Sequence, residues 1–169
     1  MATIICNSCV NSHESENTND TYSLISVGDS IPEFSVKLSD GSVCTNKTLR
    51  NNVSVIVFFN TDCPDCQREL PIINSAYESY KSNADFKLIA VARTEKADSI
   101  KSYWETNNLS LPYSPQPDKT IYSKFATQRI PRIYISNKEN IVMSKFFDEE
   151  MPSLNILETA IEAAYRKSK

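Results

Sequence analysis

The 169-residue sequence has little of three things that many binding and catalytic sites require. It contains only two glycines, Gly28 and Gly41, which excludes glycine-rich phosphate loops because such loops need several glycines. Its single histidine, His13, lies in a polar N-terminal stretch, so the sequence offers almost no histidine for a catalytic or metal site. No apolar run approaches the ~18 residues of a membrane-spanning helix.

The chain also lacks a strong charge of either sign. Its net charge is −3 and its pI is about 5.3, so no basic surface is expected and nucleic acid is not an expected partner. Apolar residues make up 40% and charged residues 23%, values that are typical of a soluble globular protein. The length suits one domain with its own core, which we expect to span residues 24–169.

Residues 1–23 differ in composition from this domain. The apolar stretch at residues 1–6 is shorter than the ~7–15 residues of a signal-peptide core, and we interpret it as a signal remnant. Cys9 follows a small residue, as at a bacterial lipoprotein cleavage site, although Cys6 stands where leucine is usual, so Cys9 is a candidate lipid anchor. Residues 11–23 contain almost nothing apolar and predict a flexible tether. The alternative is a disordered terminus with incidental cysteines.

The most informative stretch joins a strand to a pair of cysteines. Residues Val53 to Phe59 are apolar and rich in β-branched side chains, which predicts a strand buried on both faces. Cys63-Pro64-Asp65-Cys66 follows after three polar residues, with Pro64 suited to the first position of a helix. Unpaired N–H groups and the helix dipole stabilise a thiolate at a helix N-terminus. The pattern therefore predicts a reactive dithiol.

Five cysteines in total argue against a disulfide scaffold. Cys6, Cys9, Cys63 and Cys66 form two CxxC pairs, and Cys44, which we expect to be a small packing residue, stands alone. A zinc site joining the two pairs would need the chain to close a gap of about 54 residues, far beyond the spacing of zinc ribbons. A static structural disulfide and half of a zinc site remain the alternatives to a redox role.

Apolar periodicity outlines the rest of the domain. The order of elements predicts a three-layer α/β/α sandwich around a mixed sheet with an N-terminal β-hairpin. The expected elements are a hairpin at 34–44, a helix from Cys63 to about Tyr80 with Pro71 inside it, a parallel strand at 86–92, a helix at 95–107, an extended or looped segment at 111–117, a short helix at 121–126, an antiparallel hairpin at 132–147 and a closing helix at 154–164.

Three features together resemble the thioredoxin fold, in its TlpA/ResA-like branch of bacterial thiol-disulfide oxidoreductases. The first is the Cys63–Cys66 motif directly after the central strand. The second is Ile130-Pro131 just before a predicted strand, where the family places a cis-proline that faces the dithiol. The third is the segment 67–71, which resembles the glutamate and proline that follow the motif in this branch.

The same resemblance extends from about Ser26 to the C-terminus, because residues 28–34 followed by Asp40-Gly41 resemble the N-terminal addition of this branch. It implies a protein-disulfide reductase that needs no cofactor other than its redox-active disulfide. It also implies protein thiols and disulfides as partners, a membrane or periplasmic electron donor, and a place in the periplasm or cell envelope. We expect the protein to be a monomer.

Site residues follow from the motifs. Cys63 is the expected nucleophile, and Cys66 the thiol that resolves the mixed disulfide. Glu69, one helical turn after Cys66, is the expected proton acceptor and donor for it, with an exposed helix charge as the alternative. Pro131 and Ile130 are expected to bind an extended partner peptide, unless the proline is an ordinary trans turn residue.

The expected substrate-binding surface also includes Asp62, Pro64 and Asp65. Asp62 stands where the family usually has tryptophan, and Arg132 stands where thioredoxins usually have threonine. Both changes lie on the expected substrate-facing surface, so the family's partner specificity is not carried over to this chain. The two carboxylates oppose the helix terminus in stabilising a thiolate, which favours a reductant or weak oxidant. Alternatively, both acids point to solvent and only cap the helix. Arg129 and Arg132 flank Pro131 and could bind acidic partners or simply be solvated.

Two other functions are weighed against this one. A peroxiredoxin shares the fold, but its peroxide site needs proline seven residues and threonine or serine three residues before the cysteine, where this chain has Ile56 and Asn60. A non-catalytic binding module with an inert disulfide is the third hypothesis.

Overall fold

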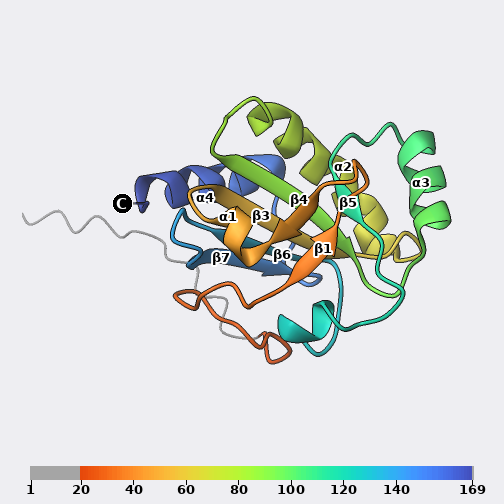
Figure 1. Ribbon diagram of the computed structural model, residues 1–169, viewed down its shortest axis with the longest axis horizontal. Coiled ribbons are helices and arrows are strands. Elements are labelled where there is room, and N and C mark those ends of the chain that lie inside the picture. The colour runs from red at the N-terminus through yellow and green to blue at the C-terminus, as the bar shows by residue number, and fades with distance from the viewer. Residues whose placement is uncertain (1–19, 169) are drawn as a thin grey trace, which may run out of the picture.

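The computed structural model describes residues 20–168 (Figure 1). Cys6 and Cys9, with the predicted signal remnant and lipid anchor, lie outside these residues. None of the helices in the described part has the length and apolar character needed to span a bilayer.

A five-stranded mixed sheet forms the centre of the fold, with the order β5-β4-β3-β6-β7. β3 pairs in parallel with β4 and antiparallel with β6, β4 pairs in parallel with β5, and β6 and β7 form an antiparallel hairpin. The strands are β3 Val53–Phe59, β4 Phe86–Ala92, β5 Tyr113–Ser114, β6 Arg132–Ser136 and β7 Val142–Phe147. This mixed sheet confirms the predicted fold class.

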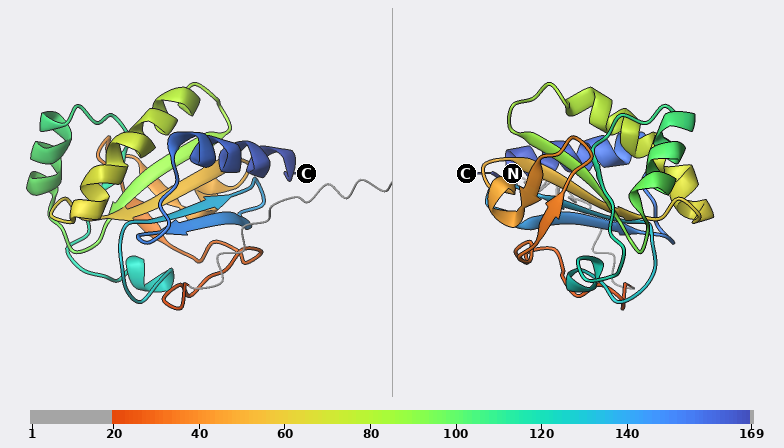
Figure 2. Two further views of the ribbon diagram at one scale, coloured as in Figure 1. Left: turned by 180° about the vertical axis from the view of Figure 1, so that it is seen from behind. Right: turned by 45° about the vertical axis from the view of Figure 1, so that its right-hand side comes forward.

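Helices and a hairpin cover the two faces of this sheet (Figures 1 and 2). One face packs against the three long helices α2 Pro64–Tyr80, α3 Ala97–Thr106 and α4 Leu154–Arg166. The other face is covered by the antiparallel hairpin of β1 Ser35–Lys37 and β2 Val43–Thr45, the short helix α1 Asn46–Leu49 and the 3-10 helix η1 Tyr122–Lys124. The second outer layer is therefore built mainly from a hairpin and single helical turns.

The central strand β3 explains why both layers form. All seven of its residues are buried. Val55 and Val57 belong to the core beneath the long helices, whereas Ile56 and Phe58 belong to the core beneath the hairpin and η1. Because successive side chains of a strand point to opposite faces, an apolar run without alternation can only be stable between two layers.

The N-terminal boundary lies earlier than the sequence indicated. Residues 20–23 were expected to belong to a flexible tether, but they pack on the domain. Ser23 forms a β-bridge with Ala126 and its hydroxyl lies 3.0 Å from the hydroxyl of Tyr134. The side chain of Asp20 is 1% exposed and is paired with Arg132. The folded part of the chain thus begins no later than Asp20.

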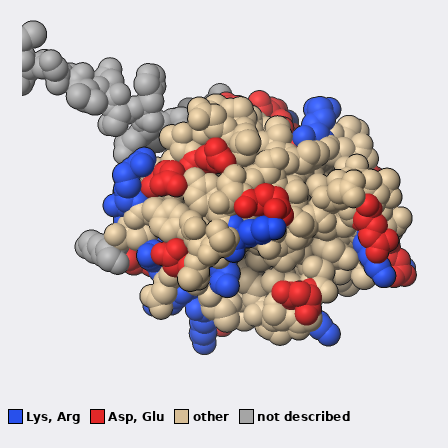
Figure 3. Space-filling model, turned by 90° about the horizontal axis from the view of Figure 1, so that it is seen from above, with Lys and Arg blue, Asp and Glu red and all other residues tan. Residues whose placement is uncertain are grey.

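Charged side chains of both signs are interspersed on the face shown in Figure 3. Positive and negative side chains form small mixed groups there, with uncharged surface between the groups. No continuous basic patch is visible on that face. This distribution agrees with the small net charge of the chain.

Candidate active site

The two cysteines of the motif lie at the junction of β3 and α2. Cys63 is the N-cap residue of α2, and its Sγ accepts a hydrogen bond from the backbone N–H of Cys66 at 3.4 Å. Cys63 is half-buried, whereas Cys66 is 0% exposed. Both are free thiols, so the structure shows the reduced dithiol. A thiolate at Cys63 would strengthen this hydrogen bond, because a charged acceptor forms a stronger hydrogen bond than a neutral one.

The environments of the two thiols differ. Burial, followed by the neighbouring Cys63 side chain, raises the pKa of the Cys66 thiol above its ordinary value. The Cys66 thiol therefore stays protonated until a base accepts its proton. Cys63 is half-buried, and its sulfur accepts the backbone N–H of Cys66, an environment that favours a thiolate.

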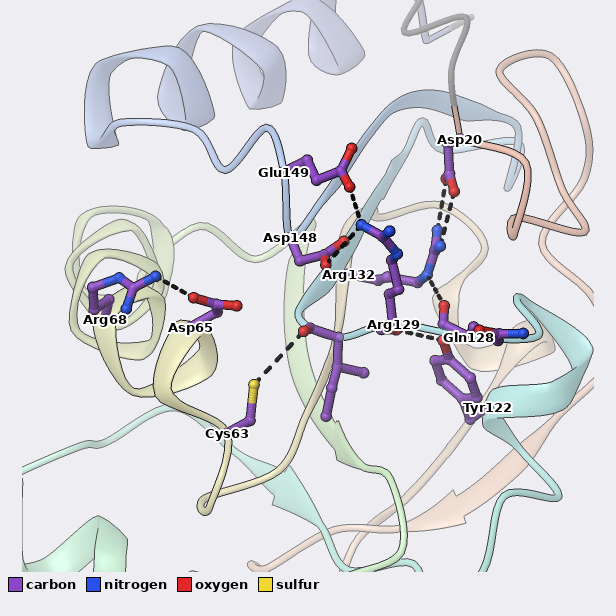
Figure 4. A network of polar contacts seen from close by, with 11 residues as sticks. Asp20, Cys63, Asp65, Arg68, Tyr122, Gln128, Arg129, Arg132, Asp148 and Glu149 are labelled. Carbon is purple, nitrogen blue, oxygen red and sulfur yellow. Dashed lines mark hydrogen bonds and ion pairs between the residues drawn. The ribbon is translucent and has the colours of Figure 1, made fainter.

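The loop before β6 approaches the dithiol from the other side. The peptide bond between Ile130 and Pro131 is cis, and Cys63 Sγ lies 3.6 Å from the carbonyl oxygen of Ile130 (Figure 4). β6 runs antiparallel to β3 with Arg132 opposite Phe58, which brings this loop to the carboxyl end of β3. Pro131 itself is buried. The part of the loop that faces Cys63 is thus the backbone of Ile130.

Two side chains hold the neighbouring carbonyl groups of this loop. The hydroxyl of Tyr122 donates to the carbonyl of Arg129 at 2.5 Å, and Nε of Arg132 donates to the carbonyl of Gln128 at 3.0 Å (Figure 4). The carbonyls of three consecutive residues therefore have three different donors, of which the last is the thiol of Cys63 at Ile130. Sequence reasoning did not identify Tyr122 in this arrangement.

Glu69 lies in α2, three residues after Cys66, as expected. Its side chain is half-buried, and its Oε2 atom is buried without a hydrogen-bond partner. Burial raises the pKa of Glu69 above its ordinary value, against the opposing charge of Arg68. A carboxyl group that is partly withdrawn from water and has a free oxygen is suited to accept or return a proton.

A buried carboxylate that the sequence analysis missed supports the turn before Cys63. Glu95 is 8% exposed, and its carboxylate accepts hydrogen bonds from the backbone N–H of Thr61, at 2.8 Å, and from the hydroxyl of Thr61. Gln67 Nε2 donates to the carbonyl of Thr61 at 2.7 Å. The position of Glu95 shortly after β4, the parallel neighbour of β3, was the available signal, because the carboxyl ends of parallel strands share one edge.

The acidic residues of the motif do not cap the helix. Cys63 occupies the N-cap position instead. Asp62 is exposed, and Asp65 forms a salt bridge with Arg68 on the surface of α2. Both acids lie at the surface, as the helix-capping alternative expected, but neither is the helix cap, because the thiol of Cys63 accepts the hydrogen bond that a cap would take.

Both arginines beside Pro131 are paired with carboxylates of the protein. Arg129 pairs with Asp148 and Glu149. Arg132 was expected on the substrate-facing surface, but it is 1% exposed and forms a bidentate salt bridge with Asp20, with N–O distances of 2.6 and 2.8 Å. That expectation was wrong because the side chain of the first residue of β6 turns beneath the N-terminal segment (Figure 4).

An open pocket of about 380 Å³ lies directly beside Cys63. Its lining is formed by Asn60, Asp62, Cys63, Arg93, Thr94, Lys119 and Ile130. These residues follow the carboxyl ends of β3, β4 and β5 or belong to the loop before β6. The pocket thus unites the expected site residues Asp62, Cys63 and Ile130 with two cations, Arg93 and Lys119, that the sequence analysis missed.

No group of three potential metal ligands occurs among residues 20–168. The zinc alternative also required Cys6 and Cys9, which lie outside those residues.

Comparisons with known proteins agree with this arrangement. The AhpC/TSA family matches residues 27–145. The thiol-disulfide oxidoreductase ResA of Bacillus cereus (strain ZK / E33L) is 23% identical over 124 residues, which cover 73% of this chain and 71% of the relative.

Solved structures share the fold. A putative protein disulfide isomerase from Bacteroides thetaiotaomicron superposes with a TM-score of 0.76 and 23% identity, over 84% of this chain and 89% of the other. A secreted disulfide oxidoreductase from Mycobacterium tuberculosis superposes with a TM-score of 0.68 and 15% identity, over 78% of this chain and 96% of the other.

Proposed function

The chain belongs to the AhpC/TSA family and is a thiol-disulfide oxidoreductase, and we propose that its redox centre is the Cys63–Cys66 dithiol. One observation carries this proposal. The half-buried thiol of Cys63 caps α2 and lies 3.6 Å from the carbonyl of Ile130, while its partner Cys66 is fully buried one turn inward. An accessible thiol backed by a buried one is the arrangement that sequential thiol exchange requires.

The reaction proceeds in two exchanges. The thiolate of Cys63 attacks one sulfur of a partner disulfide, so that a mixed disulfide forms and the other partner sulfur leaves as a thiolate. Cys66 then loses its proton and attacks the sulfur of Cys63. The Cys63–Cys66 disulfide forms, the second partner sulfur is released, and two electrons have passed from the protein to its partner.

Glu69 is the proposed acceptor of the Cys66 proton. Because burial raises the pKa of the Cys66 thiol, the second exchange needs a base nearby. Glu69 follows Cys66 by one helical turn and has a buried oxygen without a partner. In the reverse reaction the same carboxyl group returns the proton.

The partner's backbone is proposed to lie along Ile130. An extended peptide can pair with an exposed backbone edge, as in other strand-addition complexes. In this proposal Ile130 and Pro131 bind the substrate together with Asp62, Pro64 and Asp65, which surround Cys63 at the start of α2. The substrates are protein thiols and disulfides, and a membrane or periplasmic donor restores the dithiol.

The proposed location is outside the cytoplasm, in the periplasm or cell envelope, with the protein acting as a monomer and Cys9 as a candidate lipid anchor. A similar fold in a secreted disulfide oxidoreductase supports this placement. Peroxidase activity is not favoured, because Ile56 occupies the position of the required proline and is buried within β3.

A redox titration against glutathione or dithiothreitol tests the proposal. We expect a reversible two-electron couple at or below about −200 mV, as for a reductant or isomerase, that is lost in Cys63→Ser. A value near about −120 mV would make the protein a strong oxidant. The absence of any reversible couple would favour the non-catalytic binding module.

A further inference from the structure

The pocket beside Cys63 is lined by an arginine whose guanidinium has no carboxylate partner among residues 20–168. Arg93 follows directly after β4, and its guanidinium stacks over the ring of Tyr122 at 4.8 Å. Its Nε atom is buried without a hydrogen-bond partner. A buried N–H group without an acceptor is costly, and Nε itself is closed to the pocket. A ligand there would therefore meet the terminal Nη groups of this half-buried side chain.

The second cation of the pocket, Lys119, is exposed. Within residues 20–168, neither Arg93 nor Lys119 forms a salt bridge with an aspartate or glutamate. Among the described residues that line the pocket, Asp62 is the only acidic one, and it is exposed. The pocket therefore carries an excess of positive charge, which the N-terminus of α2 at Cys63 increases.

We propose that this pocket binds a carboxylate next to the disulfide of the substrate, and that Arg93 selects for it. The inference rests on the proposed function. Cys63 and Ile130 both line the pocket, so a peptide whose cystine is attacked by Cys63 places a neighbouring side chain there. A guanidinium with free N–H groups matches a carboxylate in shape and charge. The preferred substrate is thus a protein disulfide flanked by aspartate or glutamate.

The competing interpretation is that Arg93 only packs on Tyr122, which itself holds the carbonyl of Arg129. In that case, replacing Arg93 would alter the rates for all substrates by one common factor. Recognition of a carboxylate instead changes the ratio of rates for an acidic and a neutral substrate. This ratio is unaffected by a general loss of activity, and it therefore separates the two interpretations.

The experiment uses two cyclic disulfide peptides that differ only in glutamate or glutamine beside one cysteine. Their reduction by the reduced protein is followed in single turnovers at low salt. We expect the wild-type protein to reduce the glutamate peptide about tenfold faster, and this preference to weaken as salt screens the charges. The ratio should fall close to one in Arg93→Gln. It should fall less in Lys119→Gln, which keeps the guanidinium, and in Arg93→Lys, which keeps both positive charges but loses the planar fork.

Lys47→Gln is the matched control, because Lys47 is an exposed cation in α1, before the amino end of β3, whereas Cys63 follows the carboxyl end. It should keep the full preference. A wild-type ratio near one, or an unchanged ratio in Arg93→Gln, would overturn the inference. Oxidised glutathione carries its carboxylates on a small molecule, and dependence on Arg93 for glutathione alone would overturn the assignment to a peptide. Failure of the wild-type protein to reduce either peptide would count against the proposed function instead.

Discussion

Two regions of this molecule differ in whether their buried charged groups are paired. Beneath the N-terminal segment, Arg132 is paired with Asp20 on both nitrogens of its fork, and Lys145 Nζ lies 3.6 Å from the same carboxylate. Around the dithiol, Nε of Arg93 and Oε2 of Glu69 are buried without partners. A charge that is fully paired within the protein has no capacity left for a ligand or a proton, whereas an unpaired one does.

The comparison assigns stability to the first region and chemistry to the second. Asp20 and Arg132 are each 1% exposed, so the pair joins the N-terminal segment to β6 out of contact with solvent. Arg93 instead lines the pocket beside Cys63, and Glu69 belongs to α2, the helix that Cys63 caps. The predictions below test this division of roles, beginning with the largest expected effect.

Arg132→Met should lower the free energy of unfolding by about 3–5 kcal/mol, because it leaves the carboxylate of Asp20 buried without its partner. Urea unfolding at neutral pH measures the change. The double variant Asp20→Asn/Arg132→Met removes both charges and should recover a large part of the loss. If Arg132→Met cost less than about 1 kcal/mol, the region beneath the N-terminal segment could not be called the stabilising one.

Glu69→Gln should slow the resolution of a mixed disulfide at Cys63 by about 10²-fold, since general acid–base catalysis typically contributes at least that much. Stopped-flow measurement of partner release from a preformed mixed disulfide isolates this step. The pH dependence of the wild-type rate should also show an ionisation that the variant lacks. An unchanged rate and pH profile would show that Glu69 is only a charge on the helix.

Local sequence was sufficient for much of the fold. The strand Val53–Phe59 was predicted with its observed bounds, because an unbroken apolar run of that length has few other stable placements. The cysteine pair was placed at the start of α2 from Pro64 and the preceding strand. These features depend on neighbouring residues, and neighbouring residues are what a single sequence displays.

The surroundings of Arg132 and Arg93 could not be predicted, for a different reason. Asp20 and Arg132 are 112 residues apart, and nothing near either of them reveals the other. The place of Arg93 depends on β4 lying parallel to β3, which puts the residue after β4 beside the residues after β3. The predicted topology contained that signal. Only the structure, however, shows that the Nε atom of Arg93 has no hydrogen-bond partner among residues 20–168.

The two regions should also respond to acid in opposite directions. Burial disfavours the charged form of Asp20, but the hydrogen bonds and charge of Arg132 and the charge of Lys145 hold the pKa of this carboxyl below its ordinary value. The stability that it contributes is therefore complete above the unfolded pKa of about 3.9 and is lost as the pH falls through the folded value. Burial raises the pKa of Glu69, so its contribution is complete below about 4.3 and is lost as the pH rises through the folded value.

Urea unfolding between about pH 2 and pH 7 tests these signs in wild type, Asp20→Asn and Glu69→Gln. The stability difference between wild type and Asp20→Asn should shrink as the pH falls. Glu69→Gln should gain stability relative to wild type as the pH rises. Parallel pH curves for all three proteins would contradict the distinction between a paired and an unpaired carboxyl group.

Arg93→Gln should give the smallest effect on stability, a change in the free energy of unfolding below about 1 kcal/mol. The variant loses a cation–π contact with Tyr122, which is worth roughly 0.5–2 kcal/mol, but it also relieves a charged group of burial without an acceptor, and the two effects oppose each other. Urea unfolding of this variant and of Arg132→Met compares a half-buried arginine directly with a buried, paired one. A loss as large as that of Arg132→Met would mean that Arg93 stabilises the fold as Arg132 does. A small change would instead show that the protein keeps this charge at Cys63 at little benefit to its own stability, which is the condition expected of a group that is completed by a ligand.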